Sequence, residues 1–262
     1  MSPTLRSAAG SDIGRCRSMN QDSACTSSRL LVVADGMGGH AHGEVASALA
    51  VAALADLDTS LIGADLTEVD LLAALGGALE DAATRLTEAA RRDPELSGTG
   101  TTVVAMLVDG TRIGFAHIGD SRAYLLRDGE LTLLTRDHTL VQALVDEGRI
   151  SAAEAAEHPR RSVLVRTLQE SGDVDPDLFM HEAWLGDRYL LCSDGATAVL
   201  ADADLYDVLT SVAEPAAVVE RLIELANAGG GPDNITCVVA DLFDDPGPAE
   251  AAPPIFVGAA AT

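Results

Sequence analysis

The sequence contains no lysine. Its 17 basic residues are all arginines, they face 41 acidic residues, and the formal net charge is −24. Non-specific binding to nucleic acid depends on basic surface, so we expect no nucleic-acid partner. A negative charge of this size would also attract metal cations, although much of an acidic excess commonly serves solubility.

Long hydrophobic runs are missing as well. The longest, residues 45–55, is interrupted by Ser47 and is too short to cross a bilayer. The first twenty residues lack the apolar core of a signal peptide. We therefore expect a cytoplasmic protein with no membrane partner, in which the run at 45–55 forms a buried helix.

Cysteine is scarce and its spacing is uninformative. The four cysteines, Cys16, Cys25, Cys192 and Cys237, include no C-x-x-C pair, which argues against a zinc cage. Hydrophobic residues nevertheless make up 47% of the 262 residues, enough for one large domain or two small ones with a buried core. No repeat and no linker divides the body of the chain.

Hydrophobic periodicity predicts a definite order of elements. Helices are expected at 43–57, 68–91, 202–212 and 215–228. Strands are expected at 30–34, 101–108, 112–118, 122–127, 130–135, 178–183, 187–192 and 235–240. Asp-Gly pairs at 109–110 and 128–129 indicate hairpin turns and hence an antiparallel meander. Residues 1–11 read as a loose lead-in, and the polar stretch 137–171 as a mostly helical excursion from the sheet.

The segment 30–39 (LLVVADGMGG) combines a short buried strand with an acidic residue and glycines. Asp35 follows the apolar run, and the glycines after it leave the backbone free to adopt a positive φ. A carboxylate and main-chain carbonyls could then face one point, as hard divalent cations require. An isolated Asp-Gly is usually only a turn, but here the pattern recurs.

Four aspartates lie at predicted strand ends. Asp35, Asp120 and Asp194 each follow an apolar strand, whereas Asp233 precedes one. Neighbouring antiparallel strands begin and end at the same rim, so these side chains could meet there, with Asp22 beside them. Crowded carboxylates repel one another unless cations hold them. The all-oxygen set favours Mg²⁺ or Mn²⁺, and a metal pair suits in-line displacement at phosphorus.

Six short motifs appear in the order known from one family. They are residues 17–22 (RSMNQD), 34–39 (ADGMGG), 98–102 (GTGTT), 117–122 (HIGDSR), 192–195 (CSDG) and 231–234 (GPDN). With these motifs the sequence resembles the metal-dependent protein phosphatases of the PPM family, often called type 2C, over about residues 11–242. The resemblance implies an α+β fold in which a central antiparallel β-sandwich is flanked by helices on both sides. It also implies a phosphatase domain at 1–242 with a flap at about 137–171, and we expect a disordered tail at 243–262.

The resemblance further implies the site residues. The metal ligands would be Asp22, Asp35, Gly36, Asp120, Asp194 and Asp233, and the catalytic residues Arg17, Asp35, Asp194 and Asp233. Asp35 would bridge two metal ions, with Asp194 and Asp233 completing the shell of one ion. The Gly36 carbonyl would bind the other ion. Arg17 would hold the substrate phosphate, a role that suits a forked guanidinium.

Three positions depart from the family pattern. Gln21 stands where the family usually has Glu, and Met37 stands where some eukaryotic members have a proposed general-acid His. Ala198 replaces an Asp that, with the equivalent of Asp120, helps to hold a third metal ion. We therefore expect two Mn²⁺ or Mg²⁺ ions and a doubtful third site. Among the histidines, His40 is the first candidate for mutation.

The predicted function is that of a serine/threonine protein phosphatase, in which a metal-bridged hydroxide hydrolyses phosphoprotein monoesters. Its partners would be phosphoproteins that a serine/threonine kinase produces. The alternative is a catalytically weakened phosphatase-like module that binds or regulates phosphoproteins. Gln21 and Ala198 suggest this alternative, and turnover of a phosphopeptide would distinguish the two.

Overall fold

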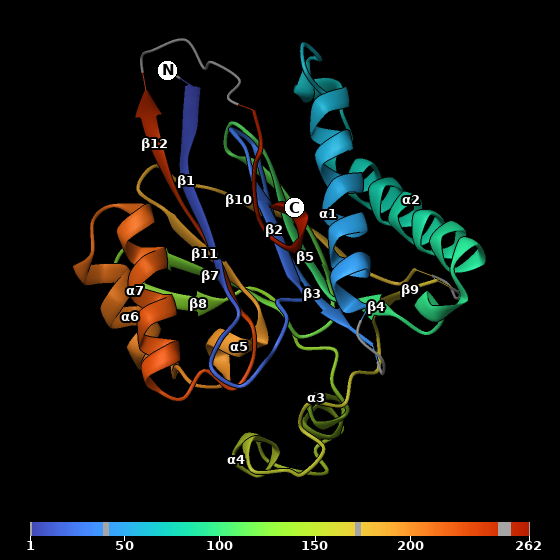
Figure 1. The fold of residues 1–262 in the computed structure, drawn as a ribbon. Helices are drawn as coiled ribbons and strands as arrows, with labels where there is room; N and C mark the ends of the chain where they lie inside the picture. The colour runs from blue at the N-terminus through green and yellow to red at the C-terminus, as the bar shows by residue number, and fades with distance from the viewer. Residues whose placement is uncertain (1, 39–41, 171–173, 246–252, 262) are drawn as a thin grey trace.

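Two antiparallel sheets lie face to face at the centre of the fold (Figure 1). The computed structural model describes residues 2–38, 42–170, 174–245 and 253–261. The five-stranded sheet runs in the order β1 (Ser2–Asp12), β12 (Ile235–Asp245), β11 (Arg188–Cys192), β7 (Arg122–Arg127) and β8 (Glu130–Leu133). The main path of the eight-stranded sheet is β10 (Asp177–Glu182), β6 (Arg112–Ile118), β5 (Val103–Asp109), β3 (Leu30–Met37), β2 (Asp22–Thr26) and β13 (Ile255–Gly258). The short strand β4 (Gly100–Thr101) joins β3 to β9 (Leu168–Gln169).

Helices cover the outer face of each sheet, which confirms the predicted α+β class. On the eight-stranded sheet lie α1 (Gly43–Ser60) and α2 (Leu71–Arg92), with the 3₁₀ turns η1 (Leu66–Glu68), η2 (Pro94–Leu96) and η3 (Ala259–Ala261) nearby. On the five-stranded sheet lie α5 (Asp194–Thr197), α6 (Asp202–Ser211) and α7 (Pro215–Ala228). Across the described ranges, every helix is too short or too polar to traverse a bilayer.

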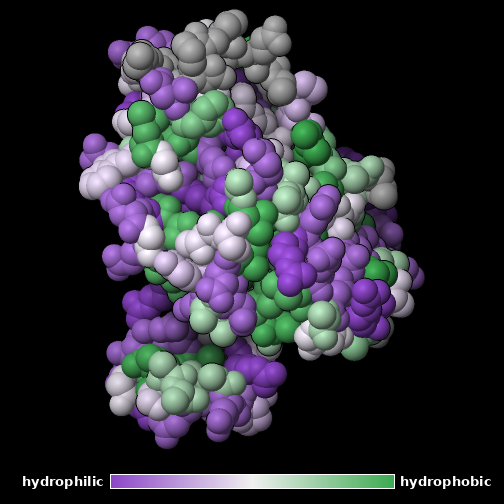
Figure 2. Space-filling view, turned by 90° about the vertical axis from the view of Figure 1, so that its left-hand side faces the viewer, coloured by the Kyte–Doolittle hydropathy of each residue, from purple (hydrophilic) through white to green (hydrophobic). Residues whose placement is uncertain are grey.

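Within the excursion at 137–171, two short helices project from the body: α3 (Leu140–Asp146) and α4 (Ala152–Ala156). They form a separate lobe below the sandwich (Figures 1 and 2). Thr139 caps α3 by accepting the Gln142 N–H, and Ser151 and Glu154 close a capping box on α4. Local capping thus defines both helices, although α4 buries no residue of its own.

Apolar side chains fill three layers. The middle layer lies between the sheets and contains the fully buried Val33, Met106 and Tyr189. The rings of Phe115 and Phe179 stack in it with centroids 5.0 Å apart. The outer layers lie under α1 and α2 on one side and under α6 and α7 on the other. Burial of this apolar surface is the main force that holds sheets and helices together.

The two predicted hairpins form, one of them with a shifted turn. Asp128 (φ +50°) and Gly129 (φ +78°) connect β7 to β8 as predicted, both in the left-handed conformation that a type I′ turn requires. Between β5 and β6, Asp109 pairs with Arg112. The connecting residues there are 110–111 rather than 109–110, because Asp109 is held in the ladder.

The prediction of a loose lead-in at 1–11 is wrong. Residues 2–12 form β1, which pairs along its whole length with β12. Leu5 is the single large apolar side chain of this segment that is buried, so the segment shows no apolar alternation. Pairing with a long neighbour, rather than its own composition, makes it a strand.

The described part of the tail also differs from the expected disorder at 243–262. β12 continues to Asp245, and Ile255–Gly258 pair with Ser23–Thr26 of β2 as β13. Val257 packs against the middle apolar layer, and Ala260 against the layer under α1. The chain thus leaves one sheet with β12 and adds a strand to the edge of the other. We call residues 253–261 the C-terminal strap.

Candidate metal centre

Strand pairing brings the first two predicted ligands together. Asp22 at the start of β2 is the register partner of Asp35 in β3. The sequence predicted that Asp35 would follow its strand. The residue lies within the strand instead, because β3 continues to Met37. The Asp35 carbonyl accepts hydrogen bonds from the Thr102 N–H (2.9 Å) and the Thr101 hydroxyl (2.9 Å), and this pairing extends the strand.

The other predicted ligands reach the same place from loops. Asp194 begins α5 directly after β11, Asp233 precedes β12, and Asp120 follows β6. The negative charges of Asp22, Asp194, Asp120 and Asp233 all act on Asp35 and raise its pKa. Such mutual repulsion requires short separations. The structure therefore gathers all five predicted aspartates at one end of the sandwich.

Burial and crowding raise the pKa values of these carboxyl groups. Burial, followed by the charges of its neighbours, raises the pKa of Asp35 well above its usual range. Burial likewise raises the pKa of Asp22 to about 7, although hydrogen bonds from Ser193 and Thr236 oppose the shift. Burial and the charges of Asp194 and Asp137 raise the pKa of Asp120 to about 7. Without a counter-charge, these groups cannot all stay ionised at neutral pH.

Two buried carboxylate oxygens are left without partners. Asp22 Oδ1 and Asp194 Oδ1 accept no hydrogen bond from any residue that the structure describes. An unsatisfied buried polar atom is costly and calls for an explanation. A hard divalent cation bound by carboxylate and carbonyl oxygens would satisfy both atoms and offset the crowded charge. The residues present therefore fit a Mg²⁺ or Mn²⁺ site.

The glycines next to two of these aspartates are required for close packing. A Cβ on Gly36 would lie 2.0 Å from the Gly43 carbonyl oxygen, and one on Gly195 would lie 1.9 Å from the Asn234 carbonyl oxygen. Neither glycine has a positive φ, so the prediction that the glycine after Asp35 serves a left-handed backbone is wrong for Gly36. They let separate backbone segments touch behind the carboxylates.

Arg17 lies at the edge of this cluster. Its guanidinium donates a hydrogen bond to Asp233 Oδ2 at 2.6 Å, and that contact raises the pKa of Arg17, as do the charges of Asp35 and Asp194. The side chain remains about half exposed (52%). The structure thus places Arg17 against a predicted metal ligand, with its other donors accessible.

Sequence reasoning missed three residues that hold the carboxylates in place. Ser193 donates to Asp22 Oδ2 at 2.7 Å, and the Asp35 N–H donates to Thr102 Oγ1 at 3.0 Å. Asn234 accepts the Gln21 N–H and donates to the carbonyls of Ile13 and Met19. Each stands inside one of the quoted motifs, and Ser193 and Asn234 are next to an aspartate. A small hydroxyl or amide residue in that position was the available signal.

The structure shows which groups surround Gln21 and Ala198, two of the positions that depart from the family pattern. The Gln21 amide donates to Glu44 Oε2 at 3.1 Å, so an acidic group lies beside it at the start of α1. Ala198 lines a cavity of about 400 Å³ between the centre and the projecting lobe. Its core wall includes Asp120, Asp137 and Asp194, and α3 and α4 form the opposite wall. His40 lies outside the described residues.

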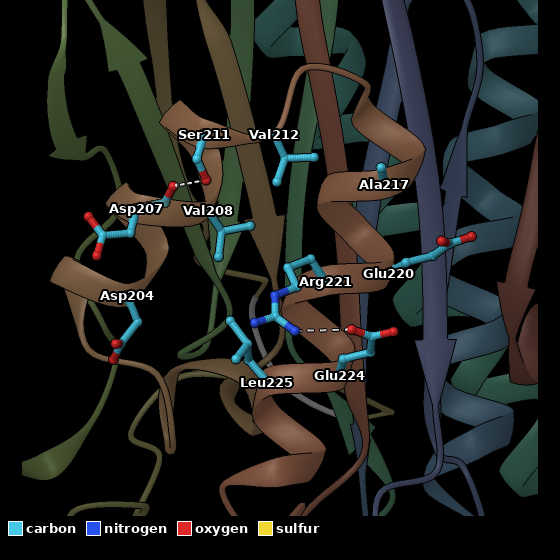
Figure 3. Close-up of a pocket in the computed structure, with 10 residues that line it drawn as sticks. All are labelled: Asp204, Asp207, Val208, Ser211, Val212, Ala217, Glu220, Arg221, Glu224 and Leu225. Carbon is cyan, nitrogen blue, oxygen red and sulfur yellow. Dashed lines mark hydrogen bonds and ion pairs between the residues drawn. The ribbon is translucent and has the colours of Figure 1, made fainter.

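A second hollow, of about 510 Å³, lies between α6 and α7 on the outer face of the five-stranded sheet (Figure 3). Acidic side chains such as Asp204, Asp207 and Glu220 surround it, and Arg221 is paired with Glu224 at 3.2 Å. It includes none of the predicted site residues, so it is separate from the candidate metal centre.

At one end of the helix-flanked double sheet, crowded carboxylates form an oxygen-rich cluster of the kind that binds divalent cations in proteins. Comparison with known families makes the assignment specific. The family model for protein phosphatase 2C matches residues 15–228. The chain belongs to this family, as the resemblance predicted.

Relatives of known structure and name agree. The chain is 52% identical over 240 residues to serine/threonine protein phosphatase PstP of Mycobacterium tuberculosis, covering 92% of this chain and 45% of PstP. It is 35% identical to serine/threonine phosphatase stp of Listeria welshimeri, covering 88% and 93%. A crystal structure of the PstP catalytic domain with two manganese ions superposes with a TM-score of 0.85 at 50% identity, covering 93% and 100%. The chain thus spans somewhat less than half the length of PstP.

Proposed function

We propose that this chain is a metal-dependent serine/threonine protein phosphatase that hydrolyses phosphoprotein monoesters. The observation that carries the proposal is the convergence of five aspartates, one fully buried and four partly buried, at one end of the sandwich, where two of them have unpartnered oxygens. The two manganese ions in the related PstP catalytic domain support the same interpretation.

In this proposal Asp35 would be a ligand of both divalent ions, and Asp194 and Asp233 would complete the set of ligands for one of them. The Gly36 carbonyl would be a ligand of the other ion, and Asp22 would contribute mainly through water. When bound, the ion pair lowers the pKa of water and stabilises the charge that develops on phosphorus. Asp120 borders the third site, which Ala198 leaves with fewer ligands.

The chain's own residues bind and orient the substrate. Arg17 is held at the site by Asp233, and its exposed donors suit a bidentate hold on two phosphate oxygens. The Ser193 hydroxyl holds the Asp22 carboxylate, and Thr102 holds the backbone of Asp35, before any ligand arrives. Such preorganisation is a large part of electrostatic catalysis.

The proposal extends to the path by which a substrate reaches the centre. We propose that residues 137–171 act as a flap that borders the substrate path, since α3 and α4 line the cavity next to Asp120 and Asp194. The substrates would be phosphoproteins made by a serine/threonine kinase.

The acidic balance of the sequence supports the absence of a nucleic-acid partner. We also propose that the protein acts in the cytoplasm.

The test is release of phosphate from a phosphoserine or phosphothreonine peptide with Mn²⁺. We expect turnover that EDTA abolishes, and a loss on the order of 100-fold or more in Asp35→Asn, because one ligand of both ions is weakened. A folded wild-type protein without activity in Mn²⁺ or Mg²⁺ would overturn the proposal. Tight peptide binding without turnover would favour the regulatory module that Gln21 and Ala198 suggest.

A further inference from the structure

A buried histidine pair lies next to the loop that carries Asp120. The imidazoles of His117 and His138 are 4.7 Å apart between ring centroids. They lie beside Asp177, the register partner of His117 on β10. Both residues are almost fully buried, at 0% and 3% exposure, and neither is one of the proposed metal ligands or catalytic residues.

His138 is bonded to Gly119 twice. Its Nδ1 accepts the Gly119 N–H at 3.1 Å, and its own backbone N–H donates to the Gly119 carbonyl at 2.8 Å. Its Nε2 lies 3.1 Å from Asp177 Oδ2. The ring therefore spans from the residue just before Asp120 to the edge strand β10.

These bonds determine the tautomer of the ring. A backbone N–H can only donate, so Nδ1 of His138 must be the unprotonated nitrogen. Nε2 must then carry the hydrogen and donate it in a hydrogen bond to Asp177. Ligand atoms of His117, His138 and Asp177 lie within 4.8 Å of one another, a spacing that could hold a metal ion. However, a metal ion on Nε2 would move the proton to Nδ1, against the Gly119 N–H. The cluster is therefore built as a hydrogen-bond network rather than as a metal site.

His138 also joins the two segments that enter and leave the lobe, residues 138–139 and 164–166, which we call the neck of the lobe. Its carbonyl accepts the Val165 N–H at 2.8 Å from the returning limb, and Thr139 forms a bridge with Leu164. Arg166 on that limb donates to Asp177 Oδ1 at 2.8 Å. Both limbs of the excursion therefore converge on His138 and on its partner Asp177.

A continuous chain of contacts leads from Gly119 to the backbone of Asp35. A Cβ on Gly119, which has φ +111°, would lie 2.5 Å from the Thr102 side chain, so this loop is packed directly on Thr102. The hydroxyls of Ser121 and Thr102 are 2.7 Å apart, and Thr102 Oγ1 accepts the Asp35 N–H. His117 adds a second support, because its Nε2 donates to the Ser121 carbonyl at 2.9 Å.

We propose that His138 is a positioning residue that fixes the loop 119–121, and with it Asp120, relative to the neck of the lobe. The acceptor Nδ1 performs this role by holding the Gly119 amide. The inference rests on the proposed function for its catalytic consequence, since Asp120 acts there as a metal ligand. Its structural content, a neutral ring of fixed tautomer bonded to Gly119, stands independently.

Two isosteric variants separate positioning from packing. In His138→Asn the side-chain oxygen replaces Nδ1 and can still accept the Gly119 N–H, whereas the contact with Asp177 is lost. In His138→Gln the amide nitrogen replaces Nε2 and can still donate to Asp177, whereas the acceptor for Gly119 is lost. His158→Gln, on the projecting lobe, serves as the matched control.

The first readout needs neither metal nor activity. In the metal-free protein we expect faster hydrogen exchange of the Gly119 amide in His138→Gln, and near wild-type exchange in His138→Asn and His158→Gln. In the wild type, ¹⁵N shifts of the His138 ring should show a protonated Nε2 and an unprotonated Nδ1. A protonated Nδ1, equal exchange in both His138 variants, or zinc bound stoichiometrically by this cluster in the wild type would overturn the proposal.

The second readout uses p-nitrophenyl phosphate and Mn²⁺. We expect kcat to fall about tenfold in His138→Gln, the equivalent of one lost hydrogen bond, at unchanged KM. The Mn²⁺ concentration for half-maximal activity should rise with it, and His138→Asn should largely restore both values. Equal losses in the two variants would overturn the proposal. If the wild type lacks phosphatase activity, the proposed function fails, while amide exchange and ring tautomer still decide the role of His138. If the His138→Gln variant does not fold, the ring tautomer in the wild type still tests the role of His138.

Discussion

Asp22 shows at the scale of one residue how the candidate centre sacrifices stability for function. Its carboxyl group is buried, one oxygen is bonded to Ser193, and the other has no partner in the described chain. Burial raises its pKa to about 7 from an ordinary value of 3.8. A carboxyl group whose pKa is raised by folding stabilises the protein at low pH, and that contribution is lost as the pH rises through the folded value.

Asp22→Asn should therefore stabilise the metal-free protein more at pH 8 than at pH 5.5. At pH 8 the wild type buries a charge, and the gain should grow by about 2 kcal/mol across this interval, at about 1.36 kcal/mol per pKa unit. The buried histidines are present in both proteins, so the change with pH reports Asp22 together with the neighbouring aspartates on which its charge acts. Thermal unfolding in EDTA measures the difference, at about 2–4 °C per kcal/mol. A gain that is independent of pH would contradict the shifted pKa.

Arg17 gives a second prediction at this scale. Arg17→Ala should raise KM for a phosphopeptide by about tenfold, which corresponds to about 1.4 kcal/mol from one charge-assisted hydrogen bond. Arg15→Ala, two residues away, is the matched control and should leave KM unchanged. Steady-state kinetics at saturating Mn²⁺ provide the measurement. An unchanged KM in Arg17→Ala would show that this side chain does not hold the substrate phosphate.

Among the elements, α5 depends on contact between backbones. Gly195→Ala would place a methyl group 1.9 Å from the Asn234 carbonyl oxygen, and it should cost about 1–3 kcal/mol or prevent folding, as overpacking does. Gly77→Ala in α2 meets nothing within 4 Å. It should stabilise the protein by about 0.5–1 kcal/mol, because alanine favours a helix interior. Thermal unfolding of both variants would measure the two effects, and a stable Gly195→Ala protein would contradict the close packing.

Elements with a strong local signal could be predicted from the sequence. α2, α6 and α7 follow helical periodicity, α1 is rich in alanine and has few helix breakers, and Asp128–Gly129 is a typical hairpin turn sequence. β1 and β13 could not be predicted, because each becomes a strand by pairing with a distant partner, β12 and β2 respectively. Their sequences carry no apolar alternation that marks them as strands.

The same distinction between local signals and distant partners applies to the candidate site. Asp35, Asp120 and Asp194 could be assigned because carboxylates beside glycine recur in a fixed order along the chain. Thr102 and Ser193, which hold the carboxylates, could not be assigned a role, since a small hydroxyl residue has many uses. His138 is informative only once Gly119 is seen to donate to its ring. Hydrogen-bond partners that are far apart in sequence leave no trace in local composition.

For the molecule as a whole, the C-terminal strap covers an otherwise open edge. Deletion of residues 246–262 would leave the backbone groups of β2 unpaired, and exposed strand edges promote association between chains. We expect a lower melting temperature and concentration-dependent association, measured by thermal unfolding and light scattering. An unaltered, monomeric truncated protein would contradict this role.

A point variant offers the control for this deletion. Gly258 has φ +71°, and a Cβ there would lie 2.2 Å from the Asp22 carbonyl oxygen. Gly258→Val should therefore displace the strap while the chain keeps its full length, and it should reproduce the effect of the deletion. Ile255→Thr changes an exposed strap residue (59%) and should leave the protein close to wild type.

The position of Gly258 against Asp22 has a mechanical consequence. A load applied near Ala261, whether by a fused domain, a surface attachment or a pulling instrument, would first act on β13. The next strand to receive it would be β2, which begins with a predicted metal ligand. Tension at this end of the described chain would thus reach the candidate metal centre across a single strand, whereas tension on β1 would enter through the opposite sheet.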